Sequence, residues 1–287
     1  MKLLIEPANK TKLYQEYVDG LILPLKDFAV QSEVYFEIAE IKKIIQNNPS
    51  LQIFVNINKN IFNNEIDNLK EQLLQLDNLN ITAIMFYDLA LLELKQELNL
   101  KTDLVWNQSY MVNNYKTCNY YYQKKVNYAY LSKEITLDEI IEISKNSAIN
   151  TMVEVVGLPT VAFSRRKLIT NYFKDINKIP TKKLDILEKV TNKTYQLTED
   201  KNGTNFYLKE VVNGTSIINS LHQANIPYII MKEYGIESNL FTELLNDTKN
   251  YIEGNCQDKN YVEKYQKLGD NTNFFFKKTI YQVKRNG

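Results

Sequence analysis

The chain has 287 residues, of which 44% are hydrophobic and 24% are charged. This is enough apolar sequence for a large globular core. The formal net charge is only +1, which excludes a global field that would draw the whole protein onto nucleic acid. No apolar run approaches the ~20 residues of a membrane span, and the apolar run at the N-terminus is too short for a signal peptide. We therefore expect a cytoplasmic protein.

The chain contains two cysteines, Cys118 and Cys256, which are far apart and outside any CxxC pair. This spacing argues against a disulfide scaffold and against a cysteine-bound zinc or iron–sulfur site within the chain. No cofactor is therefore expected in this chain itself.

Short apolar runs alternate with helical patterns along residues 1–156. The predicted strands are Leu3–Glu6, Leu21–Leu25, Gln52–Ile57, Ile81–Tyr87, Thr102–Trp106, Tyr128–Leu131 and Thr151–Val156. The predicted helices are Ser32–Gln46, Asn64–Leu76, Leu89–Leu98 with Asp88 as its N-cap, Asn113–Lys124, and Thr136–Lys145 with a capping box of Thr136 and Glu139. This alternation of predicted strands and helices is typical of parallel βαβ units.

The sequence therefore predicts an α/β fold, a TIM-like (β/α)8 barrel. Seven of its eight strands are predicted before residue 157, so the eighth must come later in the chain. Pro227–Lys232, between the predicted helices Ser216–Ala224 and Ser238–Ile252, can supply the eighth strand. Residues 157–226 then form a long excursion between strands seven and eight, over the barrel mouth, with β-like pieces at Thr194–Leu197 and Asn205–Val211. We expect one domain over 1–287, made of 1–156, 157–226 and 227–287. A doubly wound open sheet is the alternative, but no GxGxxG follows the first strand.

Barrel chemistry belongs at the C-terminal ends of the strands. The residues expected there are Glu6, Lys26, Asn58, Asp88, Asn107, Gln108, Ser132, Gly157 and Lys232. Glu6, Asp88 and Glu154 could together hold a metal, although capping or helix packing is the favoured explanation for at least two of them. The single histidine, His222, falls in a predicted helix, where a packed or surface role is favoured over catalysis.

The stretch Val153–Phe173 is unusual because it contains two of the three arginines of the chain, Arg165 and Arg166, followed by Lys167. Arginine offers a planar fork of donors that matches a carboxylate or a phosphate. The stretch therefore suggests an anion site just after a strand end. A solvated basic turn that caps a helix is an equally good explanation.

Two further runs combine aromatic and basic residues, Tyr120–Lys125 and Phe274–Lys278, the latter followed by Lys284 and Arg285. Such mixtures suit base stacking. For the first run, core packing or surface coverage is the favoured reading in so tyrosine-rich a chain. The second run suggests an edge strand or a docking segment.

The sequence resembles the collagenase-like peptidase family, number thirty-two in the peptidase "U" group. The most specific match is Glu154-Val-Val-Gly157 followed by Phe163-Ser-Arg-Arg-Lys-Leu-Ile-Thr-Asn-Tyr-Phe173. The order and spacing of weaker matches agree over nearly the full length. They are Leu3–Pro7, Val55–Asn58, Phe86–Asp88, Trp106–Gln108 and Gly214–Ile217. The short members from low-GC Gram-positive bacteria and their relatives are the most similar.

The resemblance implies a barrel and two kinds of activity. Some members are described as proteases, and others are implicated in oxygen-independent hydroxylation, including that of a wobble uridine in tRNA. The hydroxylation members carry an iron–sulfur cluster on cysteines, the RNA-directed ones depend on prephenate, and short and long members can act as a pair.

This chain departs from the family pattern at two positions. The family histidine before the glycine is Val156, and the position that is commonly cysteine after the arginine is Lys167. We therefore expect a subunit of a prephenate-dependent tRNA uridine hydroxylation system, acting in a hetero-oligomer with a cysteine-bearing, iron–sulfur paralogue. The alternative is a peptidase or other hydrolase. The expected catalytic residues are Glu154 and Ser164, and the expected anion-binding residues are Arg165, Arg166, Lys167, Asn171, Asn58 and Asn107.

Overall fold

The structure is a computed structural model that describes residues 1–190, 192–255, 258–269 and 275–276. Eight parallel strands close into a barrel, because the sixth and seventh strands pair with each other as well as with their other neighbours. The strands are β1 (Lys2–Glu6), β2 (Gly20–Pro24), β3 (Gln52–Ile57), β4 (Ala83–Phe86), β5 (Asp103–Trp106), β6 (Tyr128–Tyr130), β7 (Asn150–Gly157) and β13 (Tyr228–Lys232). The predicted (β/α)8 barrel is confirmed, and the predicted eighth strand takes its place between β7 and β1.

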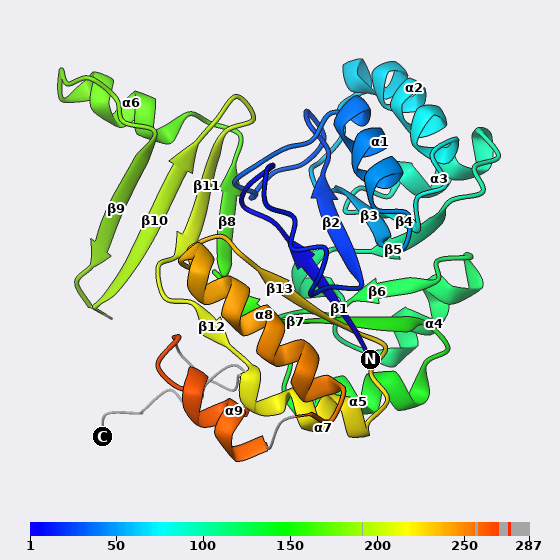
Figure 1. The fold of residues 1–287 in the computed structure, drawn as a ribbon. Helices are drawn as coiled ribbons and strands as arrows, with labels where there is room; N and C mark the ends of the chain where they lie inside the picture. The colour runs from blue at the N-terminus through cyan, green and yellow to red at the C-terminus, as the bar shows by residue number, and fades with distance from the viewer. Residues whose placement is uncertain (191, 256–257, 270–274, 277–287) are drawn as a thin grey trace, which may run out of the picture.

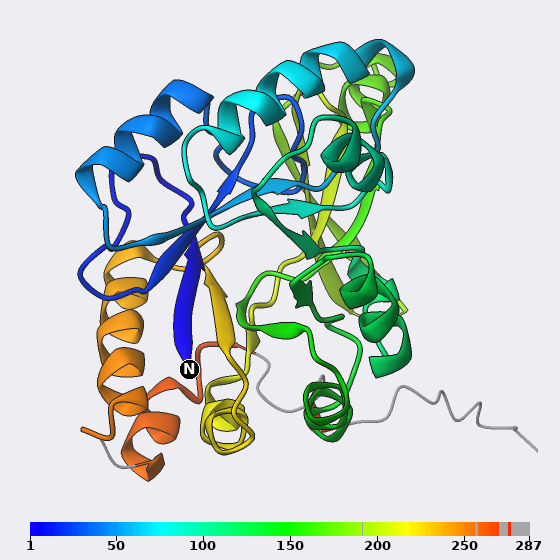
Figure 2. The ribbon, with the colours of Figure 1, turned by 90° about the vertical axis from the view of Figure 1, so that its right-hand side faces the viewer.

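Helices surround the strands on the outside of the barrel (Figures 1 and 2). They are α1 (Ile38–Asn47), α2 (Ile66–Asp77), α3 (Ala90–Glu97), α4 (Tyr115–Gln123), α5 (Leu137–Asn146), α7 (Ile218–Gln223), α8 (Ser238–Ile252) and α9 (Asp258–Tyr265), with short 3-10 turns η1 (Asn63–Glu65), η2 (Ser109–Met111) and η3 (Thr215–Ile217). The predicted capping box of Thr136 and Glu139 opens α5. None of the helices in the described ranges is both long enough and apolar enough to cross a membrane.

Two apolar layers hold the barrel. The larger one lies between the strands and the helices, and the smaller one fills the barrel interior. Interior residues include Leu4, Ile22, Phe54, Met85 and Met152. Filled interiors of this kind make the barrel a packed core, so ligands can reach only its ends.

One predicted helix is shorter than expected. Ser32–Gln46 has helical spacing, but the helix begins only at Ile38, with Glu37 and Glu40 as its capping box. The segment before it pairs instead with the end of β2, because Phe36 bridges to Leu25 and donates its backbone N–H to the Pro24 carbonyl. Tertiary pairing at the barrel mouth therefore overrides the helical pattern there.

The excursion between strands seven and eight forms an antiparallel sheet that stands beside the barrel (Figure 1). Its elements are β8 (Thr160–Ser164), α6 (Leu168–Asp175), β9 (Lys183–Glu188), β10 (Lys193–Glu199) and β11 (Thr204–Leu208), in the sheet order β8-β11-β10-β9. A short strand, β12 (Val212–Asn213), then returns to pair with β7.

The excursion is tied to loops at the barrel mouth. Asn205 accepts a hydrogen bond from the Gln31 backbone, Tyr35 donates to Asp200, and Tyr234 donates to Gln196. Within the predicted segment Phe274–Lys278, the structure describes Phe275 and Phe276. The rest of that segment lies outside the described residues, as do Lys284, Arg285 and Cys256.

Candidate functional site at the barrel mouth

A cluster of buried charges lies where β1, β6, β7 and β13 end. Glu6 and Lys232 are direct neighbours in the register of β1 and β13, and Glu154 lies on β7 at the other side of β13. Lys232 Nζ is 3.1 Å from Glu6 Oε2 and 3.5 Å from Glu154 Oε2. Lys133 Nζ is 2.6 Å from Glu154 Oε1, and the Tyr130 hydroxyl donates to Glu154 Oε2. Two carboxylates and two ammonium groups therefore neutralise one another in a largely buried site.

Mutual attraction within the cluster changes its ionisation. Burial acts to raise the pKa of the Glu154 carboxyl, but the charges of Lys133 and Lys232 outweigh it and hold this pKa below its usual value. Burial acts to lower the pKa of Lys232, but the carboxylates of Glu6 and Glu154 raise this pKa well above its usual value. Burial dominates at Lys133 and lowers the pKa of its ammonium group.

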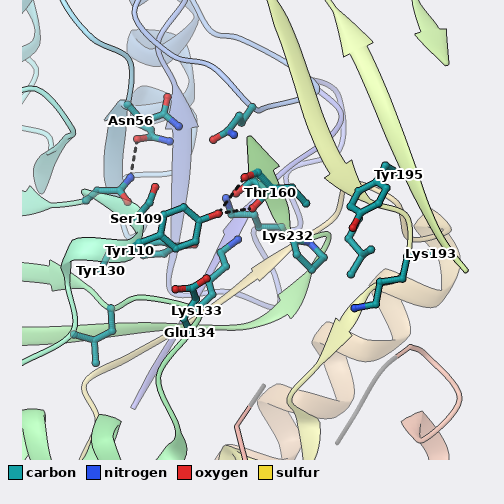
Figure 3. A pocket seen from close by; sticks show the side chains of 17 residues that line it. Asn56, Ser109, Tyr110, Tyr130, Lys133, Glu134, Thr160, Lys193, Tyr195 and Lys232 are labelled. Atoms are coloured by element: carbon teal, nitrogen blue, oxygen red, sulfur yellow. Dashed lines mark hydrogen bonds between the residues drawn. The ribbon is translucent and has the colours of Figure 1, made fainter. Parts of the chain in front are cut away.

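The cluster forms one wall of a cavity of about 240 Å³ between the barrel and the excursion (Figure 3). Lys133 and Lys232 contribute charge from the barrel, and Lys193 and Tyr195 face them from β10. The remaining lining includes Asn56, Asn107, Tyr110, Tyr130, Pro159, Thr160 and Leu208. The cavity is also lined by Glu134, so an anionic organic molecule would bind here through the lysines and amides, beside one carboxylate.

A second cavity, of about 320 Å³, continues from the first along β8. Both cavities are lined by Asn58, Asn107, Ser109, Tyr110, Thr160 and Val161. Tyr110 stands at the junction, where its hydroxyl lies 3.2 Å from the carbonyl oxygen of Val161. The two cavities are therefore parts of one groove between η2 and β8, which we call the mouth groove.

The two predicted asparagines have different roles in the groove. Asn107 is buried and its side-chain amide lies 3.3 Å from Asn56 Oδ1. Asn58 both donates to and accepts from the Val30 backbone, at 3.0 and 2.8 Å. Asn107 therefore presents an amide pair to the cavity, whereas Asn58 mainly holds the loop after β2.

The other predicted residues lie at the outer end of the groove rather than beside Glu154. Ser164 ends β8, and its Oγ accepts a hydrogen bond from the Arg166 backbone. Arg165, Arg166 and Lys167 are exposed on the turn between β8 and α6, and Asn171 is exposed on α6. None of these five residues lines the first cavity, of about 240 Å³, which we call the inner cavity. The residues expected to act together thus fall into an inner group at Glu154 and an outer group at Arg165–Asn171.

The N-terminus of α6 is occupied by a side chain of the same sheet. Glu199 Oε2 on β10 accepts hydrogen bonds from the backbone N–H groups of Ile169 at 2.8 Å and Thr170 at 3.2 Å. Thr204 accepts from the Leu168 backbone at 2.9 Å. The helix terminus is therefore already capped, and any anion at this turn must be bound by the arginine side chains.

The structure does not assemble the catalytic sets considered from sequence. His222 is exposed on α7, in the outer layer of the barrel, whereas Ser164 lies on the excursion. Asp88 accepts from the backbone N–H groups of Ala90 and Ile61, so its carboxylate joins two loops. The N-cap of α3 is Leu89, so the prediction of Asp88 as N-cap was wrong by one residue. Among the described residues no three His, Cys, Asp or Glu side chains gather as metal ligands, so the grouping of Glu6, Asp88 and Glu154 was wrong.

Sequence reasoning missed Tyr130, Lys133, Asn56, Tyr110 and Lys193. Tyr130 and Asn56 lie at or near the C-terminal ends of β6 and β3, and Lys133 follows β6 by three residues. The strand-end rule that selected Ser132 and Asn58 could have found these three residues. No comparable signal exists for Lys193, because its place opposite the barrel depends on how the excursion folds.

The chain is similar to known proteins in sequence and in structure. The sequence is 30% identical over 128 residues to the tRNA hydroxylation protein P2 of Bacillus subtilis (strain 168), a match that covers 45% of this chain and 41% of that protein. The solved U32 peptidase Mk0906 aligns with a TM-score of 0.45 at 11% identity, covering 55% of this chain and 70% of that one. A tryptophan synthase structure from Pyrococcus furiosus aligns with a TM-score of 0.48 at 11% identity, covering 88% of this chain and 98% of that one. Residues 8–231 match Peptidase family U32, and the chain belongs to this family.

Proposed function

We propose that the chain is a subunit of a tRNA hydroxylation system that acts on a wobble uridine. The observation that carries the proposal is its similarity to a tRNA hydroxylation protein over 128 residues. The mouth groove supports it, since a cavity lined by lysines, tyrosines and amides suits a nucleotide or a small organic acid better than a peptide chain.

A redox group would have to come from another subunit. Iron–sulfur clusters are usually held by four cysteine thiolates, and this chain has two cysteines in total. Cys118 is fully buried on α4, and burial raises the pKa of its thiol to about 12, so it does not offer a thiolate. The chain's residues therefore do not fit a cluster, and the proposed partner is a cysteine-bearing paralogue in a hetero-oligomer.

The inner cavity is the proposed site for a small dicarboxylate such as prephenate. Lys133, Lys193 and Lys232 bring three ammonium groups to its wall, and Glu6, Glu134 and Glu154 bring three carboxylates to the same region, so the formal charges balance. Lys193 forms no ion pair among the described residues, so its ammonium group is the one available to a dianion, with the amides of Asn56 and Asn107 also lining the cavity.

The test is mass spectrometry of tRNA nucleosides from a host strain that lacks this gene. The proposal predicts loss of the hydroxylated wobble uridine, restored by the wild-type gene. Unchanged hydroxylation would reject the proposal. Affinity purification of the chain from its host should also yield the cysteine-bearing paralogue.

Family membership favours a second candidate, a peptidase. This activity would need a nucleophile with a general base, but Val156 replaces the family histidine and is buried, and His222 lies on α7. Hydrolysis of gelatin or of short peptides by the pure protein, lost on Ser164→Ala, would support the peptidase and contradict our preferred function.

A further inference from the structure

The excursion is basic, although the whole chain is nearly neutral. Residues 157–226 contain eleven lysines and arginines and six aspartates and glutamates, a formal charge of +5. Because the whole chain carries +1, the remaining residues carry −4. The positive charge of the molecule is therefore concentrated on one appended sheet and its helix, as in proteins that contact phosphate backbones locally.

The packing of the Arg165 side chain orients its guanidinium group for contact with an anion. Its guanidinium carbon lies 3.5 Å from the centre of the Phe62 ring, in the loop between β3 and η1. Stacking on an aromatic face fixes the guanidinium plane but leaves its edge donors available. Among the described residues, no carboxylate forms an ion pair with Arg165 or with its neighbour Arg166. Both arginines are exposed, and their donors face solvent at the rim of the barrel.

The mouth groove connects this rim to the inner cavity. Its outer part follows β8 from Thr160 to Phe163, and Arg165 lies two residues further on. Tyr110 and Val161, which flank the junction of the two cavities, are 49% and 43% exposed. An exposed ring beside a groove offers a stacking surface for a base, while arginines at the end of the groove offer phosphate contacts.

We propose that the mouth groove binds a single-stranded segment of RNA, with its phosphates at Arg165 and Arg166 and one unpaired base packed against the Tyr110 ring at the entrance to the inner cavity. The inference rests on the proposed role in tRNA hydroxylation for the identity of the RNA. The two cavities of the groove, of about 240 and 320 Å³, are too small to hold a paired helix. A base that packs against Tyr110 must therefore leave its stack, and the inner cavity stays free for the small acid.

The test measures binding of the full chain to a fluorescein-labelled RNA stem-loop with a seven-nucleotide loop, by fluorescence anisotropy between 50 and 200 mM KCl. The variant is Arg165→Ala/Arg166→Ala. The matched control is Lys42→Ala/Lys43→Ala, which removes two adjacent exposed cations from the outer helix α1. All four side chains are exposed, so both variants should fold.

We expect the arginine variant to bind about tenfold more weakly at 50 mM KCl. The slope of log K against log salt should fall by about 1.4, since each lost phosphate contact on a single strand removes about 0.7. The lysine control should match the wild type, and a fully paired duplex should bind more weakly than the stem-loop. The proposal is overturned if the wild type does not bind the stem-loop, if both variants lose affinity equally, or if the duplex binds as well.

These outcomes are separable from those of the proposed function. If the gene deletion abolishes wobble hydroxylation while the arginine variant binds RNA normally, the proposed function stands and this inference fails. If the arginines prove to bind the stem-loop but the deletion leaves tRNA nucleosides unchanged, the RNA site stands and the hydroxylation role fails.

Discussion

Lys133 Nζ lies 2.6 Å from Glu154 Oε1 at the wall of the inner cavity, and the Glu154 side chain is only 5% exposed. The same carboxylate also accepts from Tyr130 and lies 3.5 Å from Lys232 Nζ. Glu154 is therefore the common partner of Tyr130 on β6, Lys133 in the following loop and Lys232 on β13. The predicted catalytic residue Glu154 is placed to organise these groups, and a direct catalytic role for it stays a prediction.

Replacement of Glu154 by glutamine should destabilise the protein. The substitution removes the carboxylate charge that neutralises the largely buried ammonium groups of Lys133 and Lys232. Loss of one partner of a buried ion pair costs about 3 kcal/mol. Urea unfolding followed by circular dichroism measures the loss. Glu97→Gln, which breaks the exposed pair with Lys70, should leave the unfolding midpoint unchanged. Equal midpoints for Glu154→Gln and the wild type would show that the cluster does not stabilise the barrel.

The same variant should change the dependence of stability on acid. The pKa of Glu154 is lowered on folding, so its stabilisation is present above its unfolded value of about 4.5 and is lost as the pH falls through the folded value. The difference in unfolding free energy between wild type and Glu154→Gln should therefore shrink below about pH 4.5. A difference that stays constant from pH 7 to pH 3 would contradict this assignment of charge.

Removal of the Glu199 side chain should loosen α6 without unfolding the barrel. Glu199→Ala frees the backbone N–H groups of Ile169 and Thr170, and the loss of a cap costs about 1 kcal/mol. Hydrogen exchange should accelerate at these two amides, while those of β1 to β7 remain protected. Glu210→Ala, an exposed acid of the same excursion, is the control, and equal exchange in the two variants would refute the capping role.

Lys193 should contribute to binding of a small dicarboxylate in the inner cavity. Lys193→Ala should weaken binding of prephenate at least fivefold in isothermal titration calorimetry, because one of three ammonium groups at the cavity is lost. Lys182→Ala removes an exposed cation of the same excursion that does not line the cavity and should bind as the wild type does. Identical affinities of the wild type, Lys193→Ala and Lys182→Ala for prephenate would show that Lys193 does not contribute to its binding site.

The barrel was predictable because its signals are local. Each strand is a short apolar run, and the alternation with amphipathic helices identifies parallel units without knowledge of tertiary contacts. The same reasoning was wrong for residues 32–37. Val34 fits the helical spacing of the apolar residues that follow it, but the backbone here pairs with the end of β2 through Phe36 and Leu25. Local pattern cannot reveal a contact of that kind.

The candidate site was only partly predictable. Glu6, Asn107 and Lys232 follow from the rule of strand ends, and Glu154 and the arginines from the signature segment. That Glu154 and Arg165 lie at opposite ends of one groove depends on the path of β8, and the capping of α6 by Glu199 depends on pairing within the excursion. Both are products of tertiary folding that spacing alone does not encode.

The most direct test of this account is the fraction of hydroxylated wobble uridine in tRNA from a deletion strain, compared after complementation with the wild-type gene and with Ser164→Ala. The account predicts no hydroxylated uridine in the deletion strain and full recovery with both genes, because Ser164 has no nucleophilic role in it. Normal hydroxylation in the deletion strain, or failure of Ser164→Ala to restore it despite normal expression, would contradict the account.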